Sequence, residues 1–148
     1  MTAVAFHTGV ASKVSHACRL VRKARQQELT AWVTGPTAEL ARLDEALWVE
    51  TPTDFLAHCL VDAAQPNWGL LRRTPVWLSE VELRPAAGVS LPSVWIHLGG
   101  ACSLKPEQFS KVIEVVGEDS EERQAARQRW RDYESRGLSP AHHAVGGT

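Results

Sequence analysis

Residues 93–98 read SVWIHL, a nearly continuous apolar run that ends at Gly99–Gly100. A strand with apolar side chains on both of its sides is covered on both faces, as the strands of a parallel sheet are. Four other short apolar runs, two of them ending at turn residues, predict further strands. These runs are VAFHT at 4–8, LTAWVT at 29–34, PVWLS at 75–79 and VIEVV at 112–116.

Helical patterns alternate with most of these strands. The predicted helices cover 13–28 (capped by Ser12), 37–48, a short segment near Pro106, and 120–136, which Gly137 ends. The order predicts an α/β fold with a Rossmann-like, mostly parallel sheet and helices on both faces. We expect one domain over residues 1–148, an irregular stretch at 61–92 and a flexible tail at 138–148.

The composition narrows the class of protein. The net charge of −1 disfavours a general nucleic-acid binder, although arginines and lysines crowd the first predicted helix and arginines the last. Three widely spaced cysteines have neither zinc-ligand spacing nor the number typical of a secreted disulfide scaffold. No apolar run approaches the ~20 residues of a membrane span. We therefore expect a reduced, cytoplasmic protein.

Catalytic and cofactor patterns are weak. The turn at 8–13 has neither the GxGxxG nor the Walker spacing, which leaves Gly99–Gly100 as the other glycine-rich loop. Cys102 follows that loop, but the sequence names no base to activate it. The histidines lack metal-site spacing. We expect no catalytic residue, cofactor or metal, and a small enzyme or nucleotide binder using Gly99–Gly100 remains the alternative.

The last predicted helix carries the strongest functional pattern. Arg123, Arg127 and Trp130 stand at i, i+4 and i+7, which places them on one stripe. Guanidinium groups capture carboxylates and stack on aromatic rings, so the stripe suits a short acidic and aromatic ligand. The competing interpretation is an ordinary amphipathic helix with solvated arginines. The pattern alone leaves the two open.

Two segments resemble a known family. RLDEALW at 42–48, followed by Phe55 and His58, resembles the RLDExLW…F…PH signature of the chi subunit of bacterial DNA polymerase III. The segment 112–137 is similar to the closing strand and helix of that family, whose pattern is basic-x3-Arg-x2-aromatic-x2-Tyr-x3-Gly. The matching residues are Arg123, Arg127, Trp130, Tyr133 and Gly137.

The resemblance implies a non-catalytic accessory subunit of the clamp loader. Chi proteins pair with the psi subunit and bind the acidic C-terminal tail of single-stranded-DNA-binding protein, which ends in an aromatic residue with a free carboxylate. Contact with single-stranded DNA would then be indirect, at replication forks in the nucleoid and without a membrane. The resemblance further implies that Arg127 pairs with the carboxylate, that Val116 and Trp130 wall a pocket, and that Arg123 attracts the preceding aspartates. It assigns no residues of this chain to psi. Trp32, Trp68, Trp77 and Trp95 are candidate contributors to that contact, with core packing as the expected role of the strand tryptophans.

Overall fold

The computed structural model describes residues 2–49, 56–100 and 104–145. Seven strands and four α-helices lie within these ranges, together with one 3₁₀ turn. In chain order they are β1 (Ala3–Val10), α1 (Lys13–Gln26), β2 (Ala31–Thr34), α2 (Thr37–Val49), β3 (Cys59–Leu60), α3 (Trp68–Leu71), β4 (Val76–Ser79), β5 (Val94–His97), η1 (Pro106–Gln108), β6 (Lys111–Gly117), α4 (Ser120–Ser135) and β7 (Ala141–Ala144).

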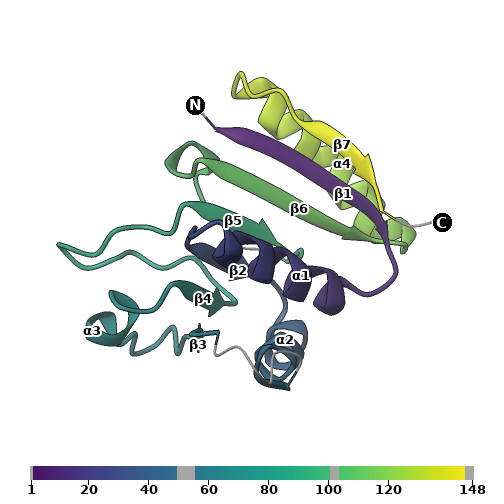
Figure 1. The fold of residues 1–148 in the computed structure, drawn as a ribbon. Coiled ribbons are helices and arrows are strands. Elements are labelled where there is room, and N and C mark those ends of the chain that lie inside the picture. The colour runs from purple at the N-terminus through teal and green to yellow at the C-terminus, as the bar shows by residue number, and fades with distance from the viewer. Residues whose placement is uncertain (1, 50–55, 101–103, 146–148) are drawn as a thin grey trace.

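The strands form one sheet in the order β3-β4-β2-β5-β6-β1-β7, and each strand pair in it is parallel. Helices cover both faces: α1 and α2 pack on one, while α3 and α4 pack on the other (Figure 1). The predicted α/β class, parallel sheet and two-sided helical cover are confirmed. The carboxyl ends of the strands of a parallel sheet lie along one edge. Helices α1, α2 and α4 follow β1, β2 and β6 in the chain, so their N-termini lie at that edge.

The two faces of the sheet differ in chemistry. The α1 and α2 face is aliphatic, with valine, leucine, isoleucine and alanine side chains. The opposite face carries an in-register row of indoles, Trp77, Trp32 and Trp95, all buried. Two residues further along the same strands runs a second buried row, Ser79–Thr34–His97–Glu114. The predicted core role of these three strand tryptophans is confirmed.

Three members of the polar row, Ser79, Thr34 and His97, bond to the indoles or to one another. Trp32 Nε1 donates to Ser79 Oγ at 2.7 Å, and Trp95 Nε1 donates to Thr34 Oγ1 at 2.8 Å. Thr34 Oγ1 also lies 2.8 Å from His97 Nδ1. Buried polar groups lower stability unless they are paired, so these contacts let polar residues occupy the middle of the sheet.

Two sequence expectations require correction. The tail after Gly137 was expected to be flexible, whereas Ala141–Ala144 form β7, which pairs in parallel with β1. The four residues of β7 are exposed, so main-chain bonding to the open edge of β1 holds the strand, and no apolar pattern announces it. The helix expected near Pro106 is one 3₁₀ turn, Pro106–Gln108, whereas the strand predicted at 112–116 is confirmed as part of β6.

Candidate functional site

A hollow of about 680 Å³ lies between α4 and the strands β6, β1 and β7, on the aromatic face of the sheet. Its lining residues are Phe6, Thr8, Val116, Arg123, Ala126, Arg127, Trp130, Arg131, Glu134 and His142. One helix supplies six of these ten residues, so the chemistry of the hollow depends mainly on the rotation of α4.

Four of the six predicted site residues meet in this hollow: Val116, Arg123, Arg127 and Trp130. Val116 is buried at the end of β6, and the Trp130 ring packs on Phe6 at a centroid distance of 5.1 Å. The hollow therefore has an apolar wall of valine, phenylalanine and indole. Aromatic pairs of this kind fix the indole in one orientation.

The other two predicted site residues, Tyr133 and Gly137, lie elsewhere. Tyr133 is buried, and its hydroxyl donates to Glu114 Oε2 at 2.6 Å, inside the core. Burial and the neighbouring Glu114 carboxylate raise the pKa of the Tyr133 hydroxyl well above its usual range. Gly137 ends α4 with φ +82°, and its N–H donates to Glu134 O at 3.0 Å. Both residues support the helix that carries the site.

Sequence reasoning missed several lining residues. Phe6 and Thr8 come from β1, which faces α4 only once the parallel sheet is assembled. His142 comes from β7, where Thr8 Oγ1 and His142 Nε2 lie 2.6 Å apart. Arg131 and Glu134 follow the predicted stripe at helical spacing, so extending that stripe by one turn would have found them.

The hollow is electrostatically positive. Arg123, Arg127 and Arg131 line it and are exposed, while Glu134 is the acidic residue among its described lining. Within the described ranges, none of these three arginines forms an ion pair. Unpaired guanidinium groups beside an apolar wall are suited to a ligand that combines carboxylates with an aromatic ring.

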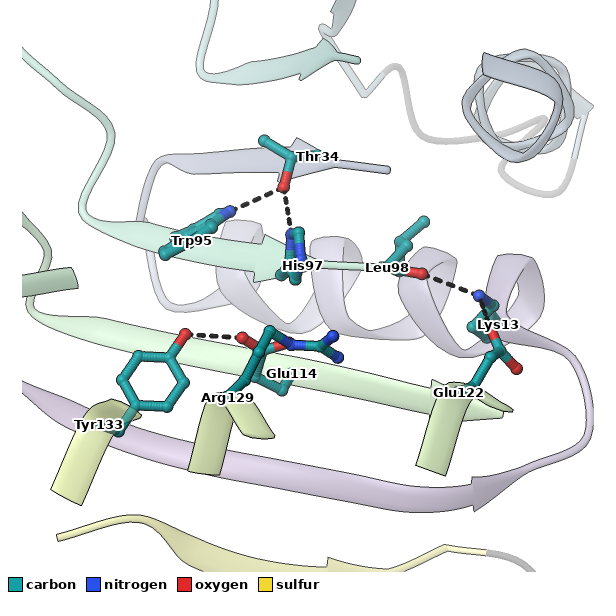
Figure 2. Close-up of polar contacts among 9 residues, drawn as sticks. All are labelled: Lys13, Thr34, Trp95, His97, Leu98, Glu114, Glu122, Arg129 and Tyr133. Atoms are coloured by element: carbon teal, nitrogen blue, oxygen red, sulfur yellow. Dashed lines mark hydrogen bonds and ion pairs between the residues drawn. The ribbon is translucent and has the colours of Figure 1, made fainter. Parts of the chain in front are cut away.

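A buried ion pair holds α4 in place (Figure 2). Glu114 on β6 is fully buried, and its two carboxylate oxygens accept from Arg129 Nε at 2.9 Å and from the Tyr133 hydroxyl. Arg129 and Tyr133 are one turn apart on α4. This double anchor sets the rotation of the helix and so directs the neighbouring stripe of Arg123, Arg127 and Trp130 into the hollow.

The Gly99–Gly100 loop lies in a different environment. Lys13 Nζ donates to Leu98 O at 2.8 Å and forms ion pairs with Glu39, at 3.1 Å, and with Glu122. The smaller hollow beside the loop, about 240 Å³, is also lined by Asp119 and Glu121. A phosphate would meet four carboxylates there, and the one lysine is already paired. Cys102 lies outside the described residues.

The RLDEALW segment, residues 42–48, serves packing at the far end of the sheet. Leu43 and Leu47 are buried in the aliphatic core. The Nε2 atom of the buried His58 lies 3.0 Å from Asp44 Oδ1. The centroid of the His58 ring lies 4.4 Å from that of the Trp48 ring. Phe55, the remaining residue of this signature, lies outside the described residues.

Within the described ranges, we find no group of three histidine, cysteine, aspartate or glutamate side chains that could hold a metal ion. Nor is any helix in those ranges long and apolar enough to cross a membrane.

The fold and the hollow define a single-sheet α/β protein whose last helix presents a cationic, aromatic-walled recognition surface. The sequence model of the family described as DNA polymerase III chi subunit, HolC, matches residues 1–141 of the 148. The chain therefore belongs to the DNA polymerase III chi subunit family and has a replication accessory role. Among curated protein sequences, none matches this chain significantly.

Proposed function

We propose that this chain binds the acidic C-terminal tail of single-stranded-DNA-binding protein in the hollow on α4 and, through the psi subunit, links that protein to the clamp loader. The observation that carries the proposal is the convergence of three unpaired arginines with an apolar wall of Val116, Phe6 and Trp130. The proposed role is non-catalytic and is performed in the cytoplasm, at replication forks.

Each part of the tail has a proposed partner. Arg127, in the middle of the stripe, pairs with the terminal carboxylate as a two-pronged donor. The terminal aromatic ring packs between Val116 and Trp130, whose indole is already fixed against Phe6. Arg123 and Arg131, one helical turn to either side of Arg127, attract the aspartates that precede the ring.

The affinity follows from the size and charge of the site. A hollow of about 680 Å³ holds only the last few residues of a peptide, so the interface is small. Interfaces at the small end of the known range are weak, and we expect micromolar binding. Because the arginines are exposed, salt screens their attraction for the tail. The screening length is about 10 Å at 0.1 M ionic strength, so binding should weaken as salt is added.

The psi contact is proposed for the opposite end of the sheet. Large apolar side chains are exposed there at the end of α2 and on β3: Trp48 is 51% exposed, Val49 65% and Leu60 44%. Exposed apolar residues that gather at one edge mark protein interfaces. This position leaves the hollow on α4 free to bind the tail.

A fluorescence titration tests the tail site. A peptide that copies the acidic, phenylalanine-ending tail is added to the full chain, and tryptophan emission is followed at low and high salt. Wild type should bind with micromolar affinity, more weakly at high salt, and amidation of the peptide C-terminus should weaken binding. Arg127→Ala should cost about 2 kcal/mol or more because the carboxylate loses its partner.

Arg136→Ala is the matched control. Arg136 caps the same helix, is exposed and pairs with Glu107 at 3.0 Å, away from the hollow. Its removal should leave the peptide affinity unchanged. Equal binding by Arg127→Ala and wild type would refute the assignment of the site.

A further inference from the structure

We propose that a second hollow, between α1 and the β1–β7 edge on the aliphatic face of the sheet, is a binding site for a phosphate group whose occupation is coupled to proton uptake. This hollow has a volume of about 440 Å³. Its polar lining is His7, His16, Lys23, Gln27, Lys111 and His143. The inference does not depend on the tail site, which lies on the opposite face of the sheet.

Four elements bring the histidine and lysine side chains together. His7 is on β1, His16 and Lys23 are on α1, Lys111 begins β6, and His143 is on β7. His7 Nδ1 lies 2.8 Å from His16 Nε2, and the His7 and His143 rings meet edge to face at 5.5 Å. Strand alternation places His142 in the tail hollow and its neighbour His143 in this one.

The hollow contains positive and neutral donors without a compensating acid. Among the described residues that line it, none is aspartate or glutamate. The charges facing His7 come from His16, His143, Lys111 and Lys23, and Arg19 faces His16. Burial is the largest cause that lowers the pKa of His7 to about 4, and these neighbours act in the same direction. Burial and then Arg19 lower the pKa of His16. The site therefore disfavours further positive charge and favours an anion.

One buried nitrogen in this cluster has no partner. His16 is 8% exposed, and its Nδ1 makes no hydrogen bond within the described ranges. A buried polar nitrogen left unsatisfied lowers stability, and such atoms are found where a ligand or water completes the bonding. His16 Nε2 faces His7 Nδ1, so only one of these two nitrogens carries a proton when both rings are neutral, and an anion in the hollow would favour protonation of the pair.

The donor types favour phosphate over carboxylate. Lysine and histidine act as separate point donors, whereas planar carboxylates are best captured by the fork of arginine, which is absent from the described lining. A phosphate monoester has three free oxygens and up to two charges, and a diester in a nucleic-acid strand has two free oxygens and one charge, so either can accept from several of these elements at once. The apolar floor, which includes Leu20, Ile113 and Val145, has room for an attached sugar or base.

Binding should take up a proton. An anion placed among the imidazoles favours their charged form, so the pKa of His7 should rise from about 4 when phosphate binds. Affinity should therefore increase as the pH falls from 7.5 to 6, by at most about tenfold per pH unit for one coupled proton. Further acidification should weaken binding, because phosphate monoesters lose their second charge below a pKa of about 6.

Imidazole resonances of the full chain, followed by NMR, test this site. The probes are inorganic phosphate, thymidine 5′-monophosphate and an eight-residue oligothymidylate, with sodium chloride of equal ionic strength as the blank. We expect all three phosphate probes to shift His7, His16 and His143 and to raise the pKa of His7. Tighter binding of the oligonucleotide assigns the phosphate to a nucleic-acid strand, and equal binding of the mononucleotide assigns it to a small ligand.

The double variant K23Q/K111Q is the decisive comparison, because both lysines are exposed and their loss spares the core. It should weaken binding of all three probes at least ~tenfold, since two of the charges facing the ligand are removed. R42Q/K105Q removes two exposed charges elsewhere and should bind as wild type does. Histidine shifts no larger than those in chloride, equal weakening by both double variants, or shifts caused only by an acidic peptide would overturn the proposal.

Discussion

Glu114 is a buried charge that connects the sheet to the functional helix. It stands in the run VIEVV, where alternation alone gives no reason for an acid, and it is 0% exposed. Arg129 and Tyr133 satisfy both of its oxygens. A buried charge is tolerated when hydrogen bonds satisfy all of its oxygens. The loss of any one of these three residues would leave a polar group of the others without its partner.

Glu114→Gln should lower the free energy of unfolding by about 3 kcal/mol, because a buried amide, with one oxygen and one NH₂ group, cannot accept from both Arg129 and Tyr133 as the carboxylate does. Tyr133→Phe should lower it by about 1–2 kcal/mol through the lost hydrogen bond. Urea denaturation measures both, with Glu45→Gln on the exposed side of α2 as the control. Loss of tail binding by Tyr133→Phe at unchanged stability would instead place that hydroxyl in the site.

His7 makes stability depend on pH. Its pKa is lowered to about 4 in the folded chain, mainly by burial, against 6.5 in the unfolded chain. As the pH falls from 6.5 towards 4, the unfolded chain binds a proton that the folded chain does not, so stability decreases over this range and is retained above it. Urea denaturation in phosphate-free buffer at pH 7.5, 6 and 5 should show this decrease.

His7→Gln should flatten the pH dependence without abolishing it. His16 and His97 also have lowered pKa values, in both cases mainly through burial, and they contribute in the same direction. A variant whose stability falls with acid as steeply as wild type would show that His7 is not the group responsible.

At the scale of the element, the two long outer helices end in the same way but with different residues. Two residues beyond the last residue of each helix the backbone is left-handed: Glu28 after α1 has φ +59°, and Gly137 after α4 has φ +82°. In both, the next N–H reaches back to the helix: Leu29 donates to Ala24 O at 2.8 Å, and Leu138 donates to Tyr133 O at 3.1 Å. Glycine adopts this left-handed conformation freely, whereas glutamate is strained in it.

The pair predicts opposite effects on stability. Glu28→Gly should stabilise the chain, and Gly137→Ala should destabilise it, each by about 1 kcal/mol. Thermal denaturation of the two variants and the double variant measures the effects, which should add because the helices lie on opposite faces of the sheet. A destabilised Glu28→Gly would mean that the Glu28 side chain makes a contact worth more than the strain.

Strands such as β5 were predictable because a strand that is buried on both faces has a run of mostly apolar residues, as in VWIH. β7 was not, because AHHA has no apolar pattern and its strand exists only through the free edge of β1. The stripe of Arg123, Arg127 and Trp130 was predictable from helical spacing. The separation of Tyr133 from that stripe was not, because it depends on the position of Glu114 across the sheet.

At the scale of the whole molecule, the sheet separates two surfaces. The tail hollow lies against β6, β1 and β7, and the exposed residues Trp48, Val49 and Leu60 lie at the end of α2 and on β3, beyond the three intervening strands β4, β2 and β5 (Figure 1). Partners bound at opposite ends of a rigid sheet do not compete, and substitutions at sites this far apart act independently. A protein that links two partners requires this independence.

The double variant V49S/L60S tests the separation. Both side chains are exposed, so their exchange for serine spares the core but removes apolar area from the proposed psi surface. Binding to purified psi, measured by calorimetry, should weaken at least ~tenfold, because apolar anchors carry most of the affinity of such interfaces. Leu70→Ser removes an exposed leucine from α3 and is the matched control. Both variants, V49S/L60S and Leu70→Ser, should bind the tail peptide as tightly as wild type does. If V49S/L60S weakened the tail and psi together, the two sites would be coupled through the sheet, and the linking role would need a cooperative mechanism instead of two independent ends.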